Sequence, residues 1–297
     1  MKELIRFDWA IKNILRDKSN FVILEGFLSE LLKEEVKIIE IIESESNKGS
    51  NEEKLNRVDL IVKLQKGEFV IIEIQNQVEY DYLQRILYGV SKTISENLKI
   101  GKAYKSIKKV ISVSIVYFDL GYGTDYVYHG TTNFVGIHNQ DKLELSPKQK
   151  KLFKKEEAKD VFPEYYILKV ENFDKKTKDG LDEWIYFLKT DEIMETFKAK
   201  GLKEAKKKLD VLKMNKEERA GYNSYLKDLH LKASLADTQQ FDLDNAKEEC
   251  INQRNIEIVI NGNKKGYSND VISDLSGLTI KEIEEILKNA PRQEKEE

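Results

Sequence analysis

The sequence predicts an α/β fold followed by an all-helical C-terminal region, and three observations support this. Runs of β-branched and other apolar residues alternate with helical patterns in the first half of the chain. Two of these runs flank a short turn that contains Gly67, which is typical of a hairpin. From about residue 178 only helical patterns follow. We therefore expect a first domain over residues 1–175 and a helical region over residues 176–297, since domains commonly have about 100–200 residues.

Hydrophobic periodicity places the elements of the first domain. Apolar residues recur every three or four positions over residues 8–33 and 79–99, which predicts helices. Gly26 lies inside the first run and argues against one unbroken helix there. The polar residues 44–56 predict an exposed loop. Strands are expected over the β-branched runs at residues 36–43, 57–64, 69–75, 110–118, 126–138 and 165–170.

The C-terminal region has helical patterns throughout. Residues 191–213 and 216–235 are rich in Lys and Glu and predict two helices. Two shorter helices are expected on either side of Ser276-Gly277, and Thr279 with Glu282 forms a capping-box pattern at the second. This layout resembles a helix-turn-helix.

A segment near 35 residues is below the size that usually folds alone, so this C-terminal end must pack on the rest of the chain, pack on a second copy, or not fold at all. It carries few basic residues, and several glutamates would repel phosphate. We therefore favour a role in homo-oligomer assembly through the C-terminal helices over DNA reading.

Composition excludes several classes of protein. The net charge is −3, from 50 basic and 53 acidic residues, so any surface that binds a polyanion must be a local patch. Cys250 is the single cysteine, which excludes an internal disulfide and a CxxC zinc site. No stretch reaches the roughly 18 apolar residues of a membrane span, and the first residues lack an apolar signal region. We expect a soluble cytoplasmic protein without a membrane partner.

The chemistry is expected at Asp59, Glu73 and Gln75. Both carboxylates interrupt apolar, strand-like runs, where a charge costs several kcal/mol unless it is paired or bound to a cation. The hairpin makes the two runs neighbours, and Glu73 and Gln75 share one face of their strand. Asp59 lies on the same face only if the register of the hairpin pairs it with a residue of that face. Such a site of hard oxygen ligands suits Mg²⁺ or Mn²⁺.

A simpler reading of the same pattern remains open. A hairpin with one face in water would expose Asp59, Glu73 and Gln75 without any function, because antiparallel sheets often alternate in this way. The uninterrupted apolar run from Phe69 to Ile72 argues against simple alternation.

Several segments in a fixed order resemble a known family. They begin with Phe7-Asp8-Trp9-Ala10-Ile11-Lys12 and continue with Lys54, Val58-Asp59-Leu60, Phe69, Ile72-Glu73-Ile74-Gln75, Gln84-Arg85-Ile86-Leu87-Tyr88, Leu98, Gly101 and Tyr104. Over about residues 5–140 the chain resembles the PD-(D/E)xK nuclease superfamily, and more closely its recombination-promoting nuclease and transposase family (Rpn-like). The order and spacing of the segments carry the resemblance.

The resemblance implies a restriction-endonuclease-like fold, with a mixed central sheet flanked by helices, and metal-assisted hydrolysis of DNA. Asp59 and Glu73 would hold Mg²⁺ or Mn²⁺, and the Ile74 carbonyl would be a further ligand. Gln75 stands where the superfamily usually has a lysine. This family commonly carries glutamine there, so the change does not imply an inactive enzyme.

Two further residues are candidates for the site. Asp8 could be an additional carboxylate at the metal, or it could cap the first helix. Arg85 follows Gln75 by ten residues on the next helix, where it could pair with a phosphate or with Glu73. Alternatively, Arg85 is a surface residue that contacts a neighbour on its own helix.

The function expected from these features is a Mg²⁺-dependent DNA endonuclease linked to recombination or transposition. One alternative is a non-catalytic DNA-binding or scaffold protein that keeps the nuclease fold. Another is an interaction protein whose C-terminal helices bind a partner.

Overall fold

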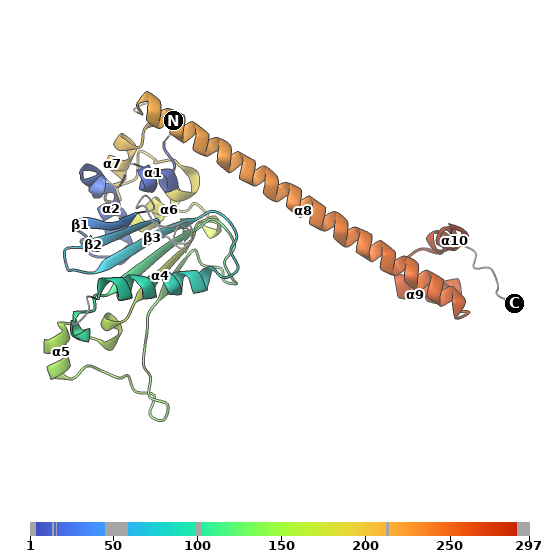
Figure 1. Cartoon of the computed structure of the whole chain (residues 1–297), viewed down its shortest axis with the longest axis horizontal. Helices are drawn as coiled ribbons and strands as arrows, with labels where there is room; N and C mark the ends of the chain where they lie inside the picture. The colour runs from blue at the N-terminus through green and yellow to red at the C-terminus, as the bar shows by residue number, and fades with distance from the viewer. Residues whose placement is uncertain are drawn as a thin grey trace. The chain divides into compact units, whose positions relative to one another are not determined.

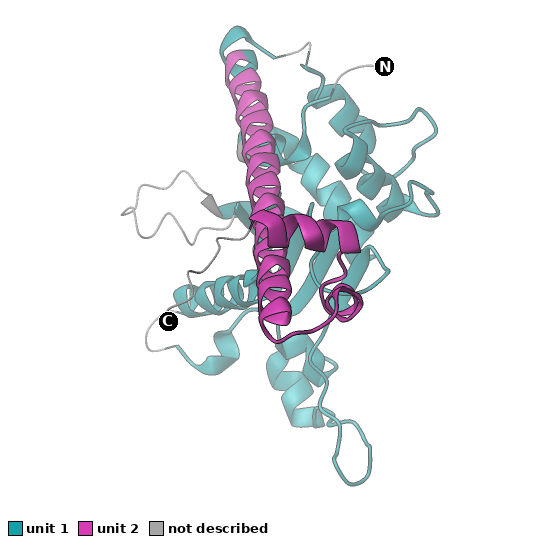
Figure 2. Ribbon diagram, turned by 90° about the vertical axis from the view of Figure 1, so that its right-hand side faces the viewer, with its two compact units in different colours: residues 1–219 teal, residues 220–297 magenta. Residues whose placement is uncertain are grey.

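The computed structural model describes residues 4–13, 15, 17–44, 59–98, 102–211 and 214–289. The chain divides into two compact units, Met1–Arg219 and Ala220–Glu297, which Figure 2 colours separately. This division lies later than the boundary expected at residue 175. The reason is that helix α6 (Gly180–Thr190) packs against α2 (Phe21–Leu32) within the first unit.

In the described residues of the first unit, six strands form a mixed sheet in the order β1-β2-β3-β4-β6-β5 (Figure 1). The strands are β1 (Ile38–Ser44), β2 (Leu60–Leu64), β3 (Phe69–Gln75), β4 (Val110–Val116), β5 (Val127–Gly130) and β6 (Glu164–Lys169). β3, β4 and β6 are parallel, whereas the β1–β2, β2–β3 and β5–β6 pairs are antiparallel. The predicted α/β fold with a mixed central sheet is thereby confirmed.

Helices cover both faces of this sheet. Among the described residues, the first unit also has the α-helices α1 (Phe7–Asn13), α4 (Tyr82–Asn97), α5 (Pro147–Phe153) and α7 (Leu202–Lys208). Short 3-10 turns are η1 (Lys18–Asn20), η2 (Tyr104–Ser106), η3 (Ala158–Val161) and η4 (Val170–Asn172). Figure 1 shows α4 on one face, and α1, α2, α6 and α7 on the other.

The side chains of β3 explain how each face is covered. Odd-numbered positions such as Phe69 and Ile71 pack with Val90 of α4. Even-numbered positions such as Ile72 therefore point to the opposite face, because side chains alternate along a strand. Burial on both faces explains the nearly continuous apolar run of this strand. Aromatic rings fill the core of the opposite helical layer, in edge-to-face contacts among Phe7, Phe27, Trp184 and Phe187.

The helical run expected over residues 8–33 is broken into α1 and α2. The polar stretch before α2 turns the chain, and the Asp17 carboxylate accepts a hydrogen bond from the backbone N–H of Ser19. Gly26 does not break α2. It lets the backbone at Lys200 approach the helix, because a Cβ at position 26 would collide with the Lys200 carbonyl oxygen.

Other expected elements are shorter than the patterns suggested. The strand expected over residues 126–138 ends at Gly130, which lies opposite Tyr165, one residue from the start of its partner β6 at Glu164. The helix expected over residues 191–213 is reduced to α7. The loop expected over residues 44–56 lies almost entirely outside the described residues.

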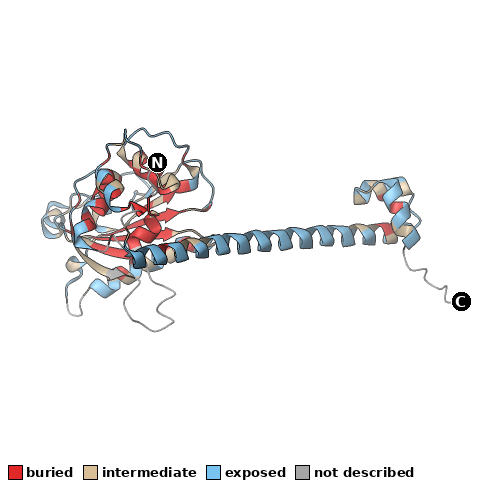
Figure 3. Ribbon diagram, turned by 90° about the horizontal axis from the view of Figure 1, so that it is seen from above, coloured by how far each residue is buried: buried red, intermediate tan, exposed pale blue. Residues whose placement is uncertain are grey.

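Up to residue 289, where the described part ends, the second unit contains the long helix α8 (Lys216–Lys264), which begins just before the unit boundary, and the short helices α9 (Asn269–Ser276) and α10 (Ile280–Asn289). α8 has 49 residues, or roughly 70 Å at the usual rise, and extends well past the expected end at residue 235. Between Gly221 and Gly262 its sequence has neither glycine nor proline to stop it. Figure 3 shows that most of its surface is exposed.

The two short helices that the sequence predicted are present, and they fold back on α8. Val259, Ile272 and Ile283 form a small buried core. Gly262 allows the close approach of α9, since a Cβ there would lie 2.8 Å from Cγ1 of Ile272. Gly277 ends α9 in the left-handed conformation, with a φ of 73°. The expected capping box at Thr279 and Glu282 is present.

Candidate active site

The hairpin register brings the two predicted carboxylates face to face. Leu60 lies opposite Ile72, so Asp59, one residue earlier, lies opposite Glu73. Directly opposed residues point to the same face of a sheet, and Gln75 shares that face. Asp59 and Glu73 are buried, with 8% and 4% of their surface exposed, whereas Gln75 is half-buried. The simpler reading of a polar face in water therefore does not hold for the two carboxylates.

Asp59 is held by the backbone of β3. Its Oδ2 accepts a hydrogen bond of 2.7 Å from the N–H of Ile74. On the other side of β3, the Gln75 carbonyl accepts from Tyr117 N–H at 3.0 Å. Backbone groups of successive strand residues point to opposite sides, so the Ile74 carbonyl is directed to the side where Asp59 lies. Asp59, Glu73 and the Ile74 carbonyl are thus gathered at one end of the hairpin.

Glu73 is paired with Arg85, which projects from the first turn of α4. Nη2 of Arg85 lies 2.6 Å from Oε1 of Glu73, but this oxygen accepts no hydrogen bond of good geometry. Burial raises the pKa of Glu73 to about 7, and the negative charges of Asp59 and Glu79 add to the effect while Arg85 opposes it. Even with the Arg85 guanidinium beside it, Glu73 is therefore poorly stabilised as an anion. This position of Arg85 shows that it is not merely a surface residue.

The donor set fits a hard divalent cation. Carboxylate and carbonyl oxygens are the ligands that Mg²⁺ and Mn²⁺ prefer, and Mg²⁺ usually keeps several waters. Within the described ranges, no three His, Cys, Asp or Glu side chains gather closely enough to hold a metal ion by themselves. A cation at Asp59 and Glu73 would take its other ligands from the Ile74 carbonyl, from Gln75 or from water.

Glu79, which the sequence interpretation missed, links two predicted site residues. Its Oε2 accepts a hydrogen bond from Gln75 Nε2 at 3.1 Å and another from Arg85 Nη1 at 3.0 Å. Glu79 lies in the turn between β3 and α4, and its carbonyl accepts the Tyr82 N–H at 3.3 Å. In the sequence, the only indication of this role was a carboxylate four residues after Gln75 and six before Arg85. The geometry of the turn makes Glu79 a neighbour of both.

Asp8 lies in a different group of charges. It is buried in the first turn of α1, where Oδ1 accepts from Trp9 N–H at 2.8 Å and lies 3.4 Å from Arg6 Nε. Asn76 Nδ2 donates to Oδ2 at 3.1 Å, which connects Asp8 to the end of β3. Arg6 also contacts Asp191, whose pKa is raised to about 6 by burial and by the charge of Asp8, with Arg6 opposing.

Asp8 is therefore not a simple helix cap. None of these contacts places it against Asp59 or Glu73. It follows the first residue of α1 and belongs to the helix itself.

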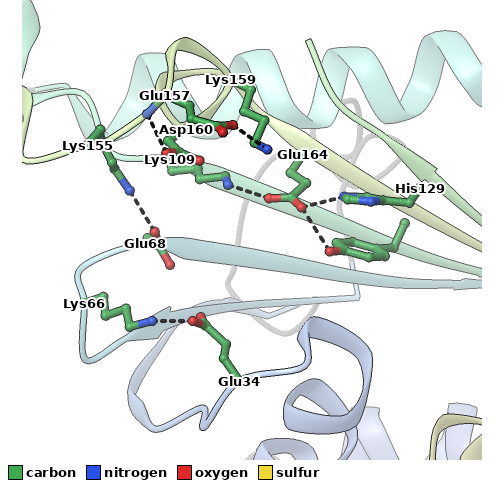
Figure 4. Close-up of polar contacts among 11 residues, drawn as sticks. Glu34, Lys66, Glu68, Lys109, His129, Lys155, Glu157, Lys159, Asp160 and Glu164 are labelled. Atoms are coloured by element: carbon green, nitrogen blue, oxygen red, sulfur yellow. Dashed lines mark hydrogen bonds and ion pairs between the residues drawn. The ribbon is translucent and has the colours of Figure 1, made fainter. Parts of the chain in front are cut away.

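Another charged cluster lies away from the site, at the amino ends of β4 and β6. Glu164 forms an ion pair with Lys109 and accepts from His129 Nε2 at 2.5 Å and Tyr166 Oη at 2.9 Å (Figure 4). The parallel strands β3 and β4 end at the opposite edge of the sheet, at Gln75 and Val116. His129 is thereby occupied in a structural network remote from the carboxylates of the hairpin.

The architecture is a restriction-endonuclease-like α/β fold. A family model for PD-(D/E)XK nuclease family transposases matches residues 5–239, well over half of the chain. The chain belongs to this family, which confirms the resemblance noted in its sequence. No curated protein and no solved structure matches it. Among the described helices, none has the length and apolar character that a membrane span requires.

Proposed function

We propose that this protein is a Mg²⁺- or Mn²⁺-dependent DNA endonuclease that hydrolyses phosphodiester bonds in DNA recombination or transposition, acting in the cytoplasm. The supporting observation is the pair of buried carboxylates, Asp59 and Glu73, opposed across the hairpin of a chain that belongs to a nuclease family. Two neighbouring buried carboxylates are costly to keep charged unless positive charge compensates them. Arg85 supplies one such charge, and a divalent cation would supply the rest.

In this proposal the chain's own residues prepare the reaction. Asp59, Glu73 and the Ile74 carbonyl would hold the cation, which when bound would lower the pKa of a coordinated water and stabilise charge on the scissile phosphate. Glu73 would have to be ionised to serve as a ligand, with its proton released to solvent and its close pairing with Arg85 loosened. Arg85 remains tied to Glu79 and can then bind a phosphate oxygen. Gln75 orients the water or the phosphate through hydrogen bonds.

We further propose that the C-terminal helices assemble copies of this chain. Large apolar side chains are exposed along α8, among them Leu231, Leu235, Phe241, Leu243 and Ile251. Apolar side chains gathered on one element are a common sign of an interaction surface. A second copy would place two nuclease sites in one assembly.

The test is cleavage of supercoiled plasmid DNA with and without Mg²⁺. We expect the wild type to nick DNA only with the metal, and Asp59→Ala combined with Glu73→Ala to abolish nicking while the protein stays folded. Glu40→Ala is the matched control, since Glu40 is a β1 carboxylate that pairs with Lys63 at the sheet edge. Nicking by the double variant at the wild-type rate would refute the site. DNA binding without nicking by the wild type would support the non-catalytic alternative.

A further inference from the structure

Glu79 determines which atom Gln75 can offer to the site. Oε2 of Glu79 accepts from the side-chain amide nitrogen of Gln75 at 3.1 Å, and its side chain is 26% exposed. A carboxylate has no proton to donate, so the end of the amide that faces it must be Nε2. The amide oxygen Oε1 is therefore directed away from Glu79. Because Gln75 and Glu73 share one face of β3, this oxygen is on the face where the two carboxylates lie.

We infer that Glu79 is a positioning residue, which holds the Gln75 amide with its oxygen toward the Asp59–Glu73 site. Gln75 then acts as an acceptor, either as an oxygen ligand of the cation or toward a proton of its bound water. The assignment rests on the metal-dependent function proposed above, and it adds how Gln75 contributes to it. A lysine at this position can only donate hydrogen bonds and carry positive charge. Gln75 thus performs a different task from the lysine usual in the superfamily.

Glu79 has a second contact that could act on the site by another route. Oε2 also accepts from Nη1 of Arg85, whose Nη2 lies beside Glu73. Loss of the Glu79 charge could let Arg85 pair more tightly with Glu73 and hinder cation binding. The two routes differ in what Glu79→Gln does. A glutamine keeps an acceptor for the Gln75 amide but removes the charge that attracts Arg85.

The experiment measures Mn²⁺ affinity of the full-length protein by titration calorimetry, without DNA. We expect Glu79→Ala to weaken Mn²⁺ binding by about 10- to 100-fold, the usual effect of losing a residue that orients a ligand. Gln75→Ala should weaken it at least as much, and the double variant no more than Gln75→Ala alone. Glu79→Gln should bind within about threefold of the wild type, because it preserves the acceptor. Glu40→Ala serves as control, and thermal unfolding verifies that each variant is folded.

Two results would overturn the inference: an effect of Glu79→Ala that persists in the Gln75→Ala background, or a Glu79→Gln variant as weak as Glu79→Ala. Either would assign the influence of Glu79 to Arg85. An unchanged affinity in Glu79→Ala would remove any positioning role. Failure of the proposed function is distinguishable, because the wild type would then bind no Mn²⁺, or Glu73→Ala would leave the binding unchanged.

Discussion

Glu73 is a carboxylate that the folded chain makes costly to ionise. It has 4% of its surface exposed, lies opposite Asp59 and has the guanidinium of Arg85 beside it. Burial raises its pKa from 4.5 to about 7. Near neutral pH the metal-free side chain is therefore divided between its two protonation states. A cation would favour the ionised state, so cation binding and deprotonation of Glu73 are coupled.

This pKa predicts how stability of the metal-free protein changes with pH. Between pH 4.5 and 7 the folded state keeps the Glu73 proton that the unfolded state loses, so the contribution of Glu73 to stability falls as pH rises. Glu73→Gln has no such proton and should gain stability relative to the wild type from pH 5 to pH 8. Urea unfolding in excess chelator measures this. Tryptophan fluorescence reports on the first unit alone, because Trp9 and Trp184 both lie there. A difference that stays constant with pH would mean that Glu73 titrates normally.

The oxygen-only donor set of Asp59, Glu73 and Ile74 predicts a metal preference. Mg²⁺ or Mn²⁺ should support DNA cleavage, whereas Ca²⁺ should support DNA binding with little turnover. Ca²⁺ accepts 6–8 ligands in flexible geometry and orders the reacting groups less well. Plasmid nicking and DNA binding, measured in parallel with each metal, test this preference. Full activity in excess chelator would contradict it.

At the scale of elements, the hairpin and α4 place the site, and α2 supports the layer on the other face of the sheet. Gly26 of α2 faces the backbone at Lys200 so closely that even a methyl group does not fit. Backbone cannot move aside as a flexible side chain can. The contact therefore depends on glycine at this position of the helix.

We expect Gly26→Ala to destabilise the first unit by about 1–3 kcal/mol, the usual cost of overpacking, despite the better helix propensity of alanine. Val22→Ala on the same helix is the control, since Val22 is 39% exposed and its truncation should cost about 0.5 kcal/mol. Urea unfolding followed by tryptophan fluorescence compares the two. Equal stability of both variants would show that α2 can shift away from Lys200.

At the scale of the whole molecule, the candidate site and the C-terminal helices belong to separate compact units. The carboxylates of the hairpin lie in Met1–Arg219, and the small core around Val259 lies in Ala220–Glu297. A chain that ends near residue 250 would lose Val259, Ile272 and Ile283, the three buried residues of this small core, together. It would keep every residue of the candidate site.

We therefore expect this shortened chain to nick DNA at high enzyme concentration, but to lose assembly or target affinity. Size-exclusion chromatography with light scattering measures the assembly, and titration of DNA measures the affinity. If the shortened chain keeps the wild-type mass, affinity and cleavage pattern, the C-terminal end has neither role. Loss of nicking at saturating DNA by a folded protein would show instead that the chemistry depends on these helices.

Much of this architecture could be predicted from local sequence. The hairpin strands, α4, β4 and the two terminal helices follow from residue periodicity, turn residues and a capping box, all of which act over a few positions. The same patterns indicated Asp59 and Glu73, because a carboxylate inside an apolar strand is chemically unusual. Resemblance of ordered motifs, rather than periodicity, indicated the nuclease family.

Tertiary structure decided what depends on residues distant in sequence or on the exact register. Register put Asp59 opposite Glu73 instead of on the other face, a difference of one residue that no local pattern determines. The turn before α4 brought Glu79 to both Gln75 and Arg85. The close approach of the Lys200 backbone explains why a glycine, Gly26, lies inside a helix. The sequence by itself thus determined the secondary-structure elements and which carboxylates are unusual. The tertiary fold decided which residues these carboxylates contact, because contacts between distant residues exist only once the chain is packed.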